Sequence, residues 1–305
     1  MRYHKGILFS IITLLLAGCE LIVDVKVPYN GDQVVINGVQ RNDSVWKVDL
    51  SRSQNILSSI RNIYFEIPNA EVFVYHPDGT TEKLEKVNYG IYKGVTKPSI
   101  GERYKVVVNA TGFESVTAEM TMPWAVPITD VKFDSTNVQP SNNGGGITPF
   151  ADVPFDVTFT DPGDQRNYYA LKVFQWTVFK YNDENQNEHS DTLIQELPVW
   201  IQDPGLATKD ERKFRFSDQI FNGKTSSIRA QTQFREIQEK IFRVDIWLMN
   251  LSEETFKYEE TLQLQRDVTG DPFAQPVPVF SNVNGGLGIF SGNTISVKRY
   301  DRKID

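Results

Sequence analysis

The chain has 305 residues, of which 40% are hydrophobic and 12% aromatic, and its formal net charge at pH 7 is −7. This hydrophobic content is sufficient to build real cores, and the length favours two domains. The acidic balance disfavours a nucleic-acid partner, because binding phosphates requires a basic patch. The single cysteine excludes a disulfide within one copy of the chain.

Residues 1–18 are typical of an export signal. Arg2 and Lys5 provide a basic start, and Gly6–Leu16 is an apolar run too short to span a bilayer comfortably. Leu16-Ala17-Gly18-Cys19 resembles the bacterial lipobox, in which a diacylglycerol thioether forms on the cysteine before cleavage. Cys19 is therefore predicted to be the lipidated first residue of the mature chain. A cysteine buried in an amphipathic first helix, or a plain secreted protein, is the alternative.

The predicted anchor determines how the mature chain meets a membrane. Removing residues 1–18 takes away two basic residues and no acidic one, which leaves 30 Lys plus Arg against 39 Asp plus Glu and a net charge of −9. Attraction to an anionic lipid surface is therefore disfavoured, so acyl groups on Cys19, palmitate among them, must hold the chain at the membrane. Residues 19–28 form a short tether, and no later apolar stretch is long enough to cross a bilayer.

Residues 29–124 are predicted to form an immunoglobulin-like or transthyretin-like β-sandwich. Hydrophobic side chains recur at every second position, which is typical of half-buried strands. Turn residues separate these strands, as at Pro77-Asp78-Gly79. The alternating positions are Val34 and Ile36; Trp46, Val48 and Leu50; Ala70, Val72 and Val74; and Tyr104, Val106 and Val108.

Residues 125–305 are predicted to form a larger antiparallel β domain. The boundary is placed at Met122–Pro127, where two prolines flank a short extended piece. Runs of aromatic and β-branched residues predict strands, as at Tyr168–Tyr181. One helix is expected near residues 252–266, because Ser252 is a good cap and two acidic residues follow it. The fold class is therefore mainly β with a single helix.

Seven phrases along the chain are informative together, namely Leu16-Ala17-Gly18-Cys19, Val34–Gly38, Val48–Ser53, Pro68–Val72, Gly90–Tyr92, Asp271–Phe273 and Ser281–Phe290. In this order they resemble a Bacteroidota family of outer-membrane lipoproteins classed as a domain of unknown function. The resemblance covers nearly the whole mature chain. It implies an outer-membrane address, with the surface-exposed face favoured over the periplasmic one. It also implies association with TonB-dependent transporters and with surface lipoproteins that help them capture nutrients.

The glycines of the Gly285-Gly286-Leu287-Gly288 run permit backbone conformations that other residues rarely adopt. A phosphate-binding loop is the sharper hypothesis, but no Lys-Ser/Thr follows and no helix is predicted to start there. The run is instead expected to make a tight connection into a last strand at Thr294–Arg299.

No catalytic residue, cofactor site or metal site is predicted. His76 and His189, the two histidines that remain after processing, fall in different predicted domains and lack nearby partners for a catalytic triad or a histidine-rich metal site. The run Asn182–Asp191 offers oxygen ligands at alternate positions, with Asp183 and Asn185 as candidates, but it lacks the glycine and the final carboxylate of a calcium loop. A polar hairpin tip is the favoured interpretation.

Contact with a partner or ligand is expected on long surface loops. Asn142 and Asn143, in the glycine-rich loop Gln139–Phe150, are candidates beside the hairpin tip. Trp124 could stack on a sugar ring if it is exposed, although core packing is the default for tryptophan. Residues 161–169 predict a turn that enters a strand, with a ligand-contacting loop as the alternative.

The sequence as a whole predicts a non-catalytic, lipid-anchored accessory or binding protein of the outer membrane. Its expected partners are a TonB-dependent transporter or other surface lipoproteins. A cell-surface glycan or peptide hydrolase is one alternative, and it would need an inward-facing carboxylate cluster in a deep cleft. An envelope-assembly or adhesion component is the other, and its binding surface should be a broad apolar patch instead of a pocket.

Overall fold

The computed structural model describes residues 29, 31–55, 65–134, 139–141, 150–203, 205–206, 215–235, 240–271, 274–275 and 277–301. The chain divides into two compact units, one of residues 1–32 and 54–61 and the other of residues 33–53 and 62–305. The elements below belong to the second unit. The expected signal segment, the expected tether with Cys19, and the loop residues Asn142 and Asn143 lie outside the described residues.

The described elements are strands with one helix, which confirms the mainly β prediction. In chain order they are β1 (Val34–Arg41), β2 (Lys47–Arg52), β3 (Glu71–Tyr75), β4 (Thr81–Asn88), β5 (Ile91–Lys93), β6 (Arg103–Asn109), β7 (Val116–Thr121), β8 (Ile128–Phe133), β9 (Gln139–Ser141), β10 (Phe150–Thr160), β11 (Tyr168–Asn182), β12 (Glu188–Leu197), β13 (Val199–Ile201), β14 (Arg215–Ser217), β15 (Thr225–Arg235), β16 (Lys240–Leu251), α2 (Glu253–Val268), β17 (Val283–Asn284) and β18 (Leu287–Asp301).

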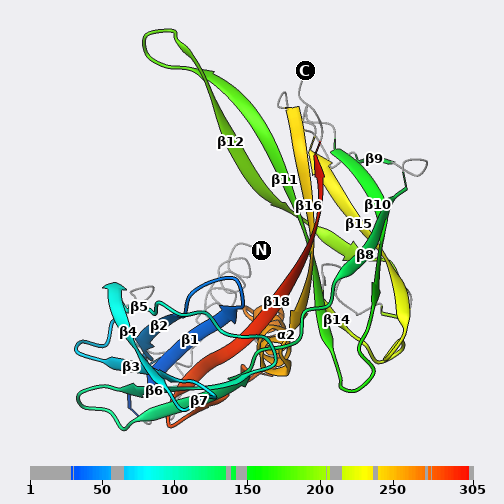
Figure 1. Cartoon of the computed structure of the whole chain (residues 1–305). Coiled ribbons are helices and arrows are strands. Elements are labelled where there is room, and N and C mark those ends of the chain that lie inside the picture. Colours follow the sequence, from blue (N-terminus) through cyan, green and yellow to red (C-terminus); the bar gives the residue numbers. More distant parts are fainter. Residues whose placement is uncertain are drawn as a thin grey trace, which may run out of the picture. The chain divides into compact units, whose positions relative to one another are not determined.

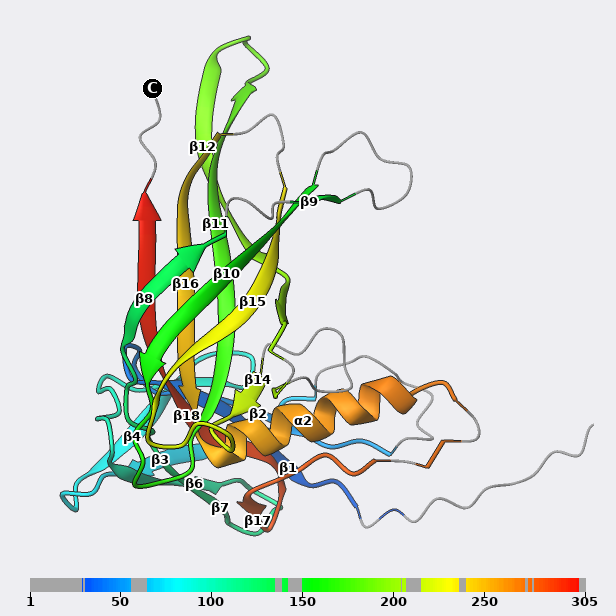
Figure 2. The ribbon, with the colours of Figure 1, turned by 90° about the vertical axis from the view of Figure 1, so that its right-hand side faces the viewer.

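The strands pair into two sheets, which Figures 1 and 2 show from two sides. The larger sheet has the order β12-β11-β16-β18-β1-β2-β5-β4-β3-β6-β7-β17, and β14 pairs with β11 beside β12. The smaller sheet has the order β13-β15-β10-β8, with β9 on β10. The pairings among the described strands are antiparallel except that of β1 with β18, so the expected antiparallel architecture is confirmed.

A first hydrophobic core lies among β1–β7, where the sequence alternation predicts a sandwich. Side chains alternate between buried and exposed along the strands, as in β6. Trp46, Leu50, Val74 and Val106 are fully buried, and each such side chain contributes about 1.5–3 kcal/mol by leaving water. The indole N–H of Trp46 donates to Thr96 Oγ1 at 3.0 Å, so its polar atom is satisfied inside this core.

A second hydrophobic core lies between the smaller sheet and one face of β11 and β16. Phe155 and Phe159 of β10 meet Tyr169 and Leu171 of β11 there, and the Phe159 and Tyr169 ring centroids are 4.9 Å apart. Ile246 of β16 closes the same core. The opposite face of β11 and β16, called the outer face here, is not covered by the smaller sheet.

Strand β18 takes part in both cores. Its first half runs parallel to β1, from Leu287 opposite Val35 to Asn293 opposite Arg41. Its second half runs antiparallel to β16 and ends with Asp301 opposite Arg243. The last strand thus starts seven residues before the expected Thr294, because pairing with β1 outweighs the low strand propensity of the glycines. The predicted division at residues 124 and 125 stays a prediction.

The helix α2 lies where the sequence predicts it. Ser252 caps its start by accepting a hydrogen bond from the backbone N–H of Thr255 at 3.3 Å, and two glutamates follow in the first turn. The buried Thr255 hydroxyl donates to Ser291 Oγ at 2.8 Å, which ties this turn to β18. The helix ends at Val268, two residues beyond the expected end. Within the described ranges, no helix is long and apolar enough to cross a membrane.

Candidate functional site

The residues singled out from the sequence do not form one cluster. Trp124 lies in the segment between β7 and β8, whereas Asp183 and Asn185 lie in the turn between β11 and β12. Cys19, Asn142 and Asn143 fall outside the described residues, so their predicted roles stay predictions. The structure therefore separates two places to consider, the hairpin tip and the surroundings of Trp124.

The hairpin tip is organised around the Asp183 carboxylate. Its Oδ1 accepts hydrogen bonds from the backbone N–H groups of Asn185 and Asn187, both at 2.9 Å. Its Oδ2 accepts from the Asn187 side chain at 3.1 Å and lies 3.0 Å from His189 Nε2. These contacts, led by the one to His189, lower the pKa of Asp183 to about 2. Both oxygens are thus used to hold the turn, as the polar hairpin tip predicts.

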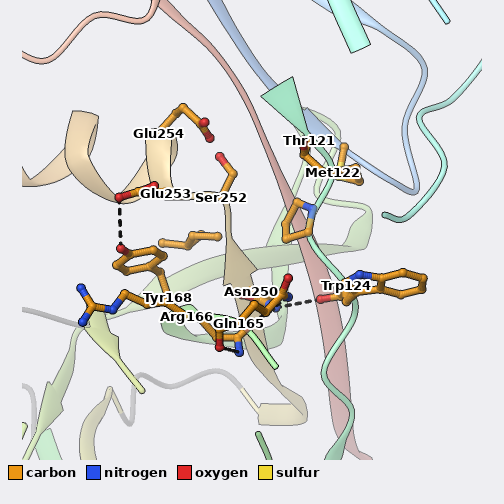
Figure 3. A pocket seen from close by; sticks show the side chains of 13 residues that line it. Thr121, Met122, Trp124, Gln165, Arg166, Tyr168, Asn250, Ser252, Glu253 and Glu254 are labelled. Atoms are coloured by element: carbon orange, nitrogen blue, oxygen red, sulfur yellow. Dashed lines mark hydrogen bonds between the residues drawn. The ribbon is translucent and has the colours of Figure 1, made fainter. Parts of the chain in front are cut away.

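A cavity of about 380 Å³ lies beside Trp124 and is the better candidate site (Figure 3). Three segments that are distant in the sequence form its walls: residues 121–124 from the last residue of β7 onward, residues 165–168 leading into β11, and residues 250–254 where β16 turns into α2. Its volume falls in the range typical of small-molecule sites. We call it the β16–α2 pocket.

Partly buried hydrogen bonds hold the pocket walls together. The Trp124 carbonyl accepts from Asn250 Nδ2 at 2.8 Å and from Thr294 Oγ1 at 3.0 Å, which fastens the segment after β7 to β16 and β18. In Figure 3 this carbonyl points toward Asn250 and the indole extends away from it. The indole lies against the backbone of Gly101, where a Cβ would come within 2.7 Å of its Cζ2. Trp124 is 57% exposed, so default core packing is wrong for this residue.

Two buried carboxylates fix the 161–169 wall. Asp218 accepts a hydrogen bond from the backbone N–H of Asn167 at 2.6 Å, while Asp161 accepts from the Tyr169 hydroxyl and from the backbone N–H of Gly223. Burial raises the pKa of Asp161, against the opposing effect of its hydrogen bonds. With exposed fractions of 2% for Asp161 and 1% for Asp218, neither side chain can meet a ligand. Their role is structural.

Along one side of the pocket, the acidic Glu253 lies between the basic side chains of Lys257 and Arg166. The Tyr168 hydroxyl donates to Glu253 Oε1 at 3.4 Å, and Lys257 Nζ lies 2.8 Å from the same oxygen. Arg166 lies beside Tyr168 (Figure 3). The hydrogen bond from Lys257 lowers the pKa of Glu253. Burial, helped by the nearby Glu253, raises the pKa of Tyr168.

Two charged groups in the pocket wall remain available to a ligand. Glu254 is partly buried, and its carboxylate has no hydrogen bond or ion pair among the described residues. Arg166 is exposed, and its guanidinium interacts with the Tyr168 hydroxyl and helps to lower the pKa of Glu253 from a solvent-facing position. The pocket therefore offers one negative and one positive group, together with amide and hydroxyl groups from Gln165 and Thr121.

Sequence reasoning identified only part of this pocket. Trp124 was a candidate by residue type, and residues 161–169 were considered as a ligand-contacting loop. Nothing in the sequence singled out Arg166 or Glu254 as functional residues, because a charged residue at a turn or in the first turn of a helix is ordinary on a protein surface. The pairing of β11 with β16 places residues 165–168 beside residues 250–254, and the hydrogen bonds to the Trp124 carbonyl add residues 121–124.

The chain matches one known protein family. A family model described as a domain of unknown function (DUF4249) matches residues 21–299. This confirms the expectation of a family classed as a domain of unknown function. No curated protein matches the chain.

One solved structure with some similarity is the crystal structure of a DUF4785 family protein from Legionella pneumophila. The sequence identity is 10% and the TM-score 0.23, with 71% of this chain and 52% of that chain covered. The chain thus spans about half the length of that protein. A likeness this loose carries no argument about fold or function.

Proposed function

Because the chain belongs to the DUF4249 family, whose function is unknown, we propose a role from the site itself: a lipid-anchored, non-catalytic binding protein that captures a small polar ligand in the β16–α2 pocket. The proposal places the chain at the outer membrane of a Bacteroidota cell, as an accessory subunit of a TonB-dependent nutrient-uptake complex. The lipobox-like Leu16-Ala17-Gly18-Cys19 and the six other family phrases support this address.

The observation that carries the binding role is the presence of the Glu254 carboxylate and the Arg166 guanidinium in the wall of one cavity, and the charge states of the neighbouring groups support it. Glu253 has a lowered pKa and stays a carboxylate near neutral pH, while Tyr168 has a raised pKa and stays a phenol. A general acid or base works best when its pKa lies near the working pH. Neither group meets that condition, since each is held in one charge state. Fixed charges of this kind suit recognition of a ligand better than proton transfer.

The pocket chemistry favours a zwitterionic ligand such as a free amino acid or a short peptide. The Glu254 carboxylate suits an ammonium group, and the Arg166 guanidinium suits a carboxylate through paired hydrogen bonds. An uncharged sugar would form an ion pair with neither group. A ligand that satisfies both is therefore favoured.

Isothermal titration calorimetry on the purified chain would test the ligand class. The probes are single amino acids, dipeptides, and mono- and disaccharides. A dipeptide or an amino acid should bind, and Glu254→Gln or Arg166→Gln should weaken its binding by about tenfold, the effect of losing roughly 1.4 kcal/mol from a charge pair. Glu260→Gln, at an exposed helix position outside the pocket, is the matched control and should change nothing.

Two results would contradict the binding role. Selective binding of saccharides that survives both pocket substitutions would contradict the proposal that the ligand is zwitterionic. Hydrolysis of the bound dipeptide, detected by chromatography of the mixture, would replace the binding protein by the peptide hydrolase that the sequence left open.

The anchor and the partnership are tested in the native cell. Cys19→Ala should move the chain out of the membrane fraction or leave it unprocessed, and mass spectrometry of the wild-type N-terminus should find acyl groups. Mild-detergent purification of the wild type should recover a stoichiometric β-barrel transporter. Unchanged membrane fractionation of Cys19→Ala argues against the anchor, and recovery of a solitary monomer argues against the uptake complex.

A further inference from the structure

The far half of the β11–β12 hairpin extends beyond the rest of its sheet. The pairing of β11 with β16 ends at Val178, whereas β11 and β12 stay paired as far as Asn182 opposite Glu188. Figures 1 and 2 both show this hairpin reaching past the end of β16. Beyond Val178 the described structure is therefore a two-stranded ribbon with two open faces. An isolated ribbon of this kind is marginally stable in water at best.

Both faces of the whole β11–β12 hairpin, residues 174–197, carry exposed apolar side chains. On the outer face, Trp176 lies opposite Ile194, which is 51% exposed. On the other face, Leu193 is 41% exposed opposite the buried Thr177, and Tyr181, in the ribbon itself, is 48% exposed and stacked on His189. A ribbon that contacts the solvent on one side needs apolar residues on one face only. Exposed apolar side chains on both faces of the hairpin indicate a partner that contacts both faces.

The net charge of the hairpin restricts the kind of surface that a partner can present to it. Residues 174–197 hold five acidic side chains and one basic one, a net charge of −4, and the basic one, Lys180, is 2.6 Å from Glu188. An anionic bilayer surface repels such a segment, and so does the same ribbon on a second copy of the chain. A complementary surface carries lysine and arginine.

We propose that the β11–β12 hairpin is a docking element that inserts into a cleft of a partner protein, with an apolar cleft floor and a basic rim. The ribbon also presents the outer edge of β12, the last strand in the sheet order, along which a strand of the partner can pair. None of the residues that line the β16–α2 pocket lies within residues 174–197, so docking and ligand capture use separate surfaces. The hairpin adds the contact surface to the proposed uptake complex.

Photo-crosslinking in the native bacterium tests this proposal with the full chain. p-Benzoylphenylalanine is placed at Tyr181 on one face and at Ile194 on the other, with Tyr89 as the matched control because it is an exposed tyrosine between β4 and β5. Both hairpin positions should form an adduct with the same polypeptide, and the Tyr89 position should not. Sequencing of the adduct should place the crosslinked partner residues among apolar residues flanked by lysine or arginine.

Charge reversal supplies the second measurement. Glu184→Lys combined with Asp191→Lys should lower the adduct yield by roughly tenfold, since both side chains are exposed on the acidic ribbon. Higher ionic strength in isolated membranes should lower the wild-type yield as well. The far-UV circular dichroism spectrum and the thermal unfolding midpoint of the purified variant serve as the folding control and should match those of the wild type.

Several results would overturn the docking proposal. They are an adduct with lipid, a crosslinked dimer of the chain, equal labelling from Tyr89, a partner segment that is acidic, or no adduct from either hairpin position. Any of these would leave pocket binding and lipid anchoring untouched. Failure of the docking proposal can therefore be told apart from failure of the proposed function.

Discussion

Gly288 shows how a single missing side chain permits the β1–β18 pairing. Its φ is +106°, and a Cβ built there would lie 1.9 Å from the Ile36 carbonyl oxygen on β1. No other residue type can take this position without moving one of the two strands. Two residues later, Phe290 is fully buried in the first core with its ring centroid 6.2 Å from that of Trp46. The glycine thus allows an aromatic side chain to reach the core.

Gly288→Ala is therefore expected to lower the free energy of unfolding by about 3 kcal/mol or more, through backbone strain and a clash with β1. Chemical denaturation monitored by circular dichroism measures this change in the free energy of unfolding. Gly79→Ala is the matched control, because Gly79 also has a positive φ of +83° but has nothing within 4 Å of an added Cβ. It should lose only about 1–2 kcal/mol. Equal losses in the two variants would show that the clash with β1 is unimportant.

The β11–β12 turn is an element whose stability rests on one ionised group. The predicted loop Asn182–Asp191 is shorter in the structure, where strand pairing continues up to Asn182 and Glu188. Five residues remain between them, and Asp183 accepts hydrogen bonds across this turn. Backbone pairing of polar residues shortened the loop, since residues 188–191 present N–H and C=O groups to β11 whatever their side chains are.

The stability of the β11–β12 turn should decrease as the pH is lowered. The pKa of Asp183 lies at about 2 in the folded chain, below its ordinary value of 3.8, so its stabilising effect is complete above 3.8 and disappears as the pH falls through about 2. NMR titration of the Asp183 carboxyl carbon should show a midpoint near 2. Asp183→Asn should broaden the turn amides at neutral pH, whereas Glu184→Gln next to it should not. A midpoint near 4 would contradict the assigned hydrogen bonds.

At the scale of the whole described fold, β18 joins two hydrophobic cores in one strand. Phe290 belongs to the first core, and Tyr300 packs against the second, with its hydroxyl donating to the Val131 carbonyl at 3.0 Å. Nine residues of continuous, paired strand separate these two side chains. If β18 detaches from one core, its strand pairing in the other core is disrupted as well. We therefore expect the two cores to unfold together.

Phe290→Ala tests this coupling. It should destabilise the fold by about 3–5 kcal/mol, the usual effect of emptying a buried aromatic site. Hydrogen exchange with mass spectrometry should show equal losses of protection in β1 of the first core and in β11 and β16 of the second. Val297→Ala, at a position 45% exposed on the same strand, is the control and should change protection little. A loss confined to β1–β7 would show two independent cores.

Local pattern and long-range pairing explain which predictions held. The alternation at Trp46, Val48 and Leu50 was sufficient to predict the first core, because a period of two shows which side chains are buried whatever the strand pairs with. The cap at Ser252 was equally local. The start of β18 was placed too late, since three glycines in four residues weaken the strand signal and β1 compensates from about 250 residues away. The β16–α2 pocket had no local signature at all.

The sequence by itself determined the mainly β fold class, the position of the helix and the family, because strand period, capping residues and motif order are properties of neighbouring residues. Only the tertiary structure decided that the glycine run leads into a strand shared by two cores, that Trp124 is exposed, and that Arg166 and Glu254 line one pocket. These features arise where distant segments meet, and burial and close backbone approach between such segments depend on the packing of the whole fold.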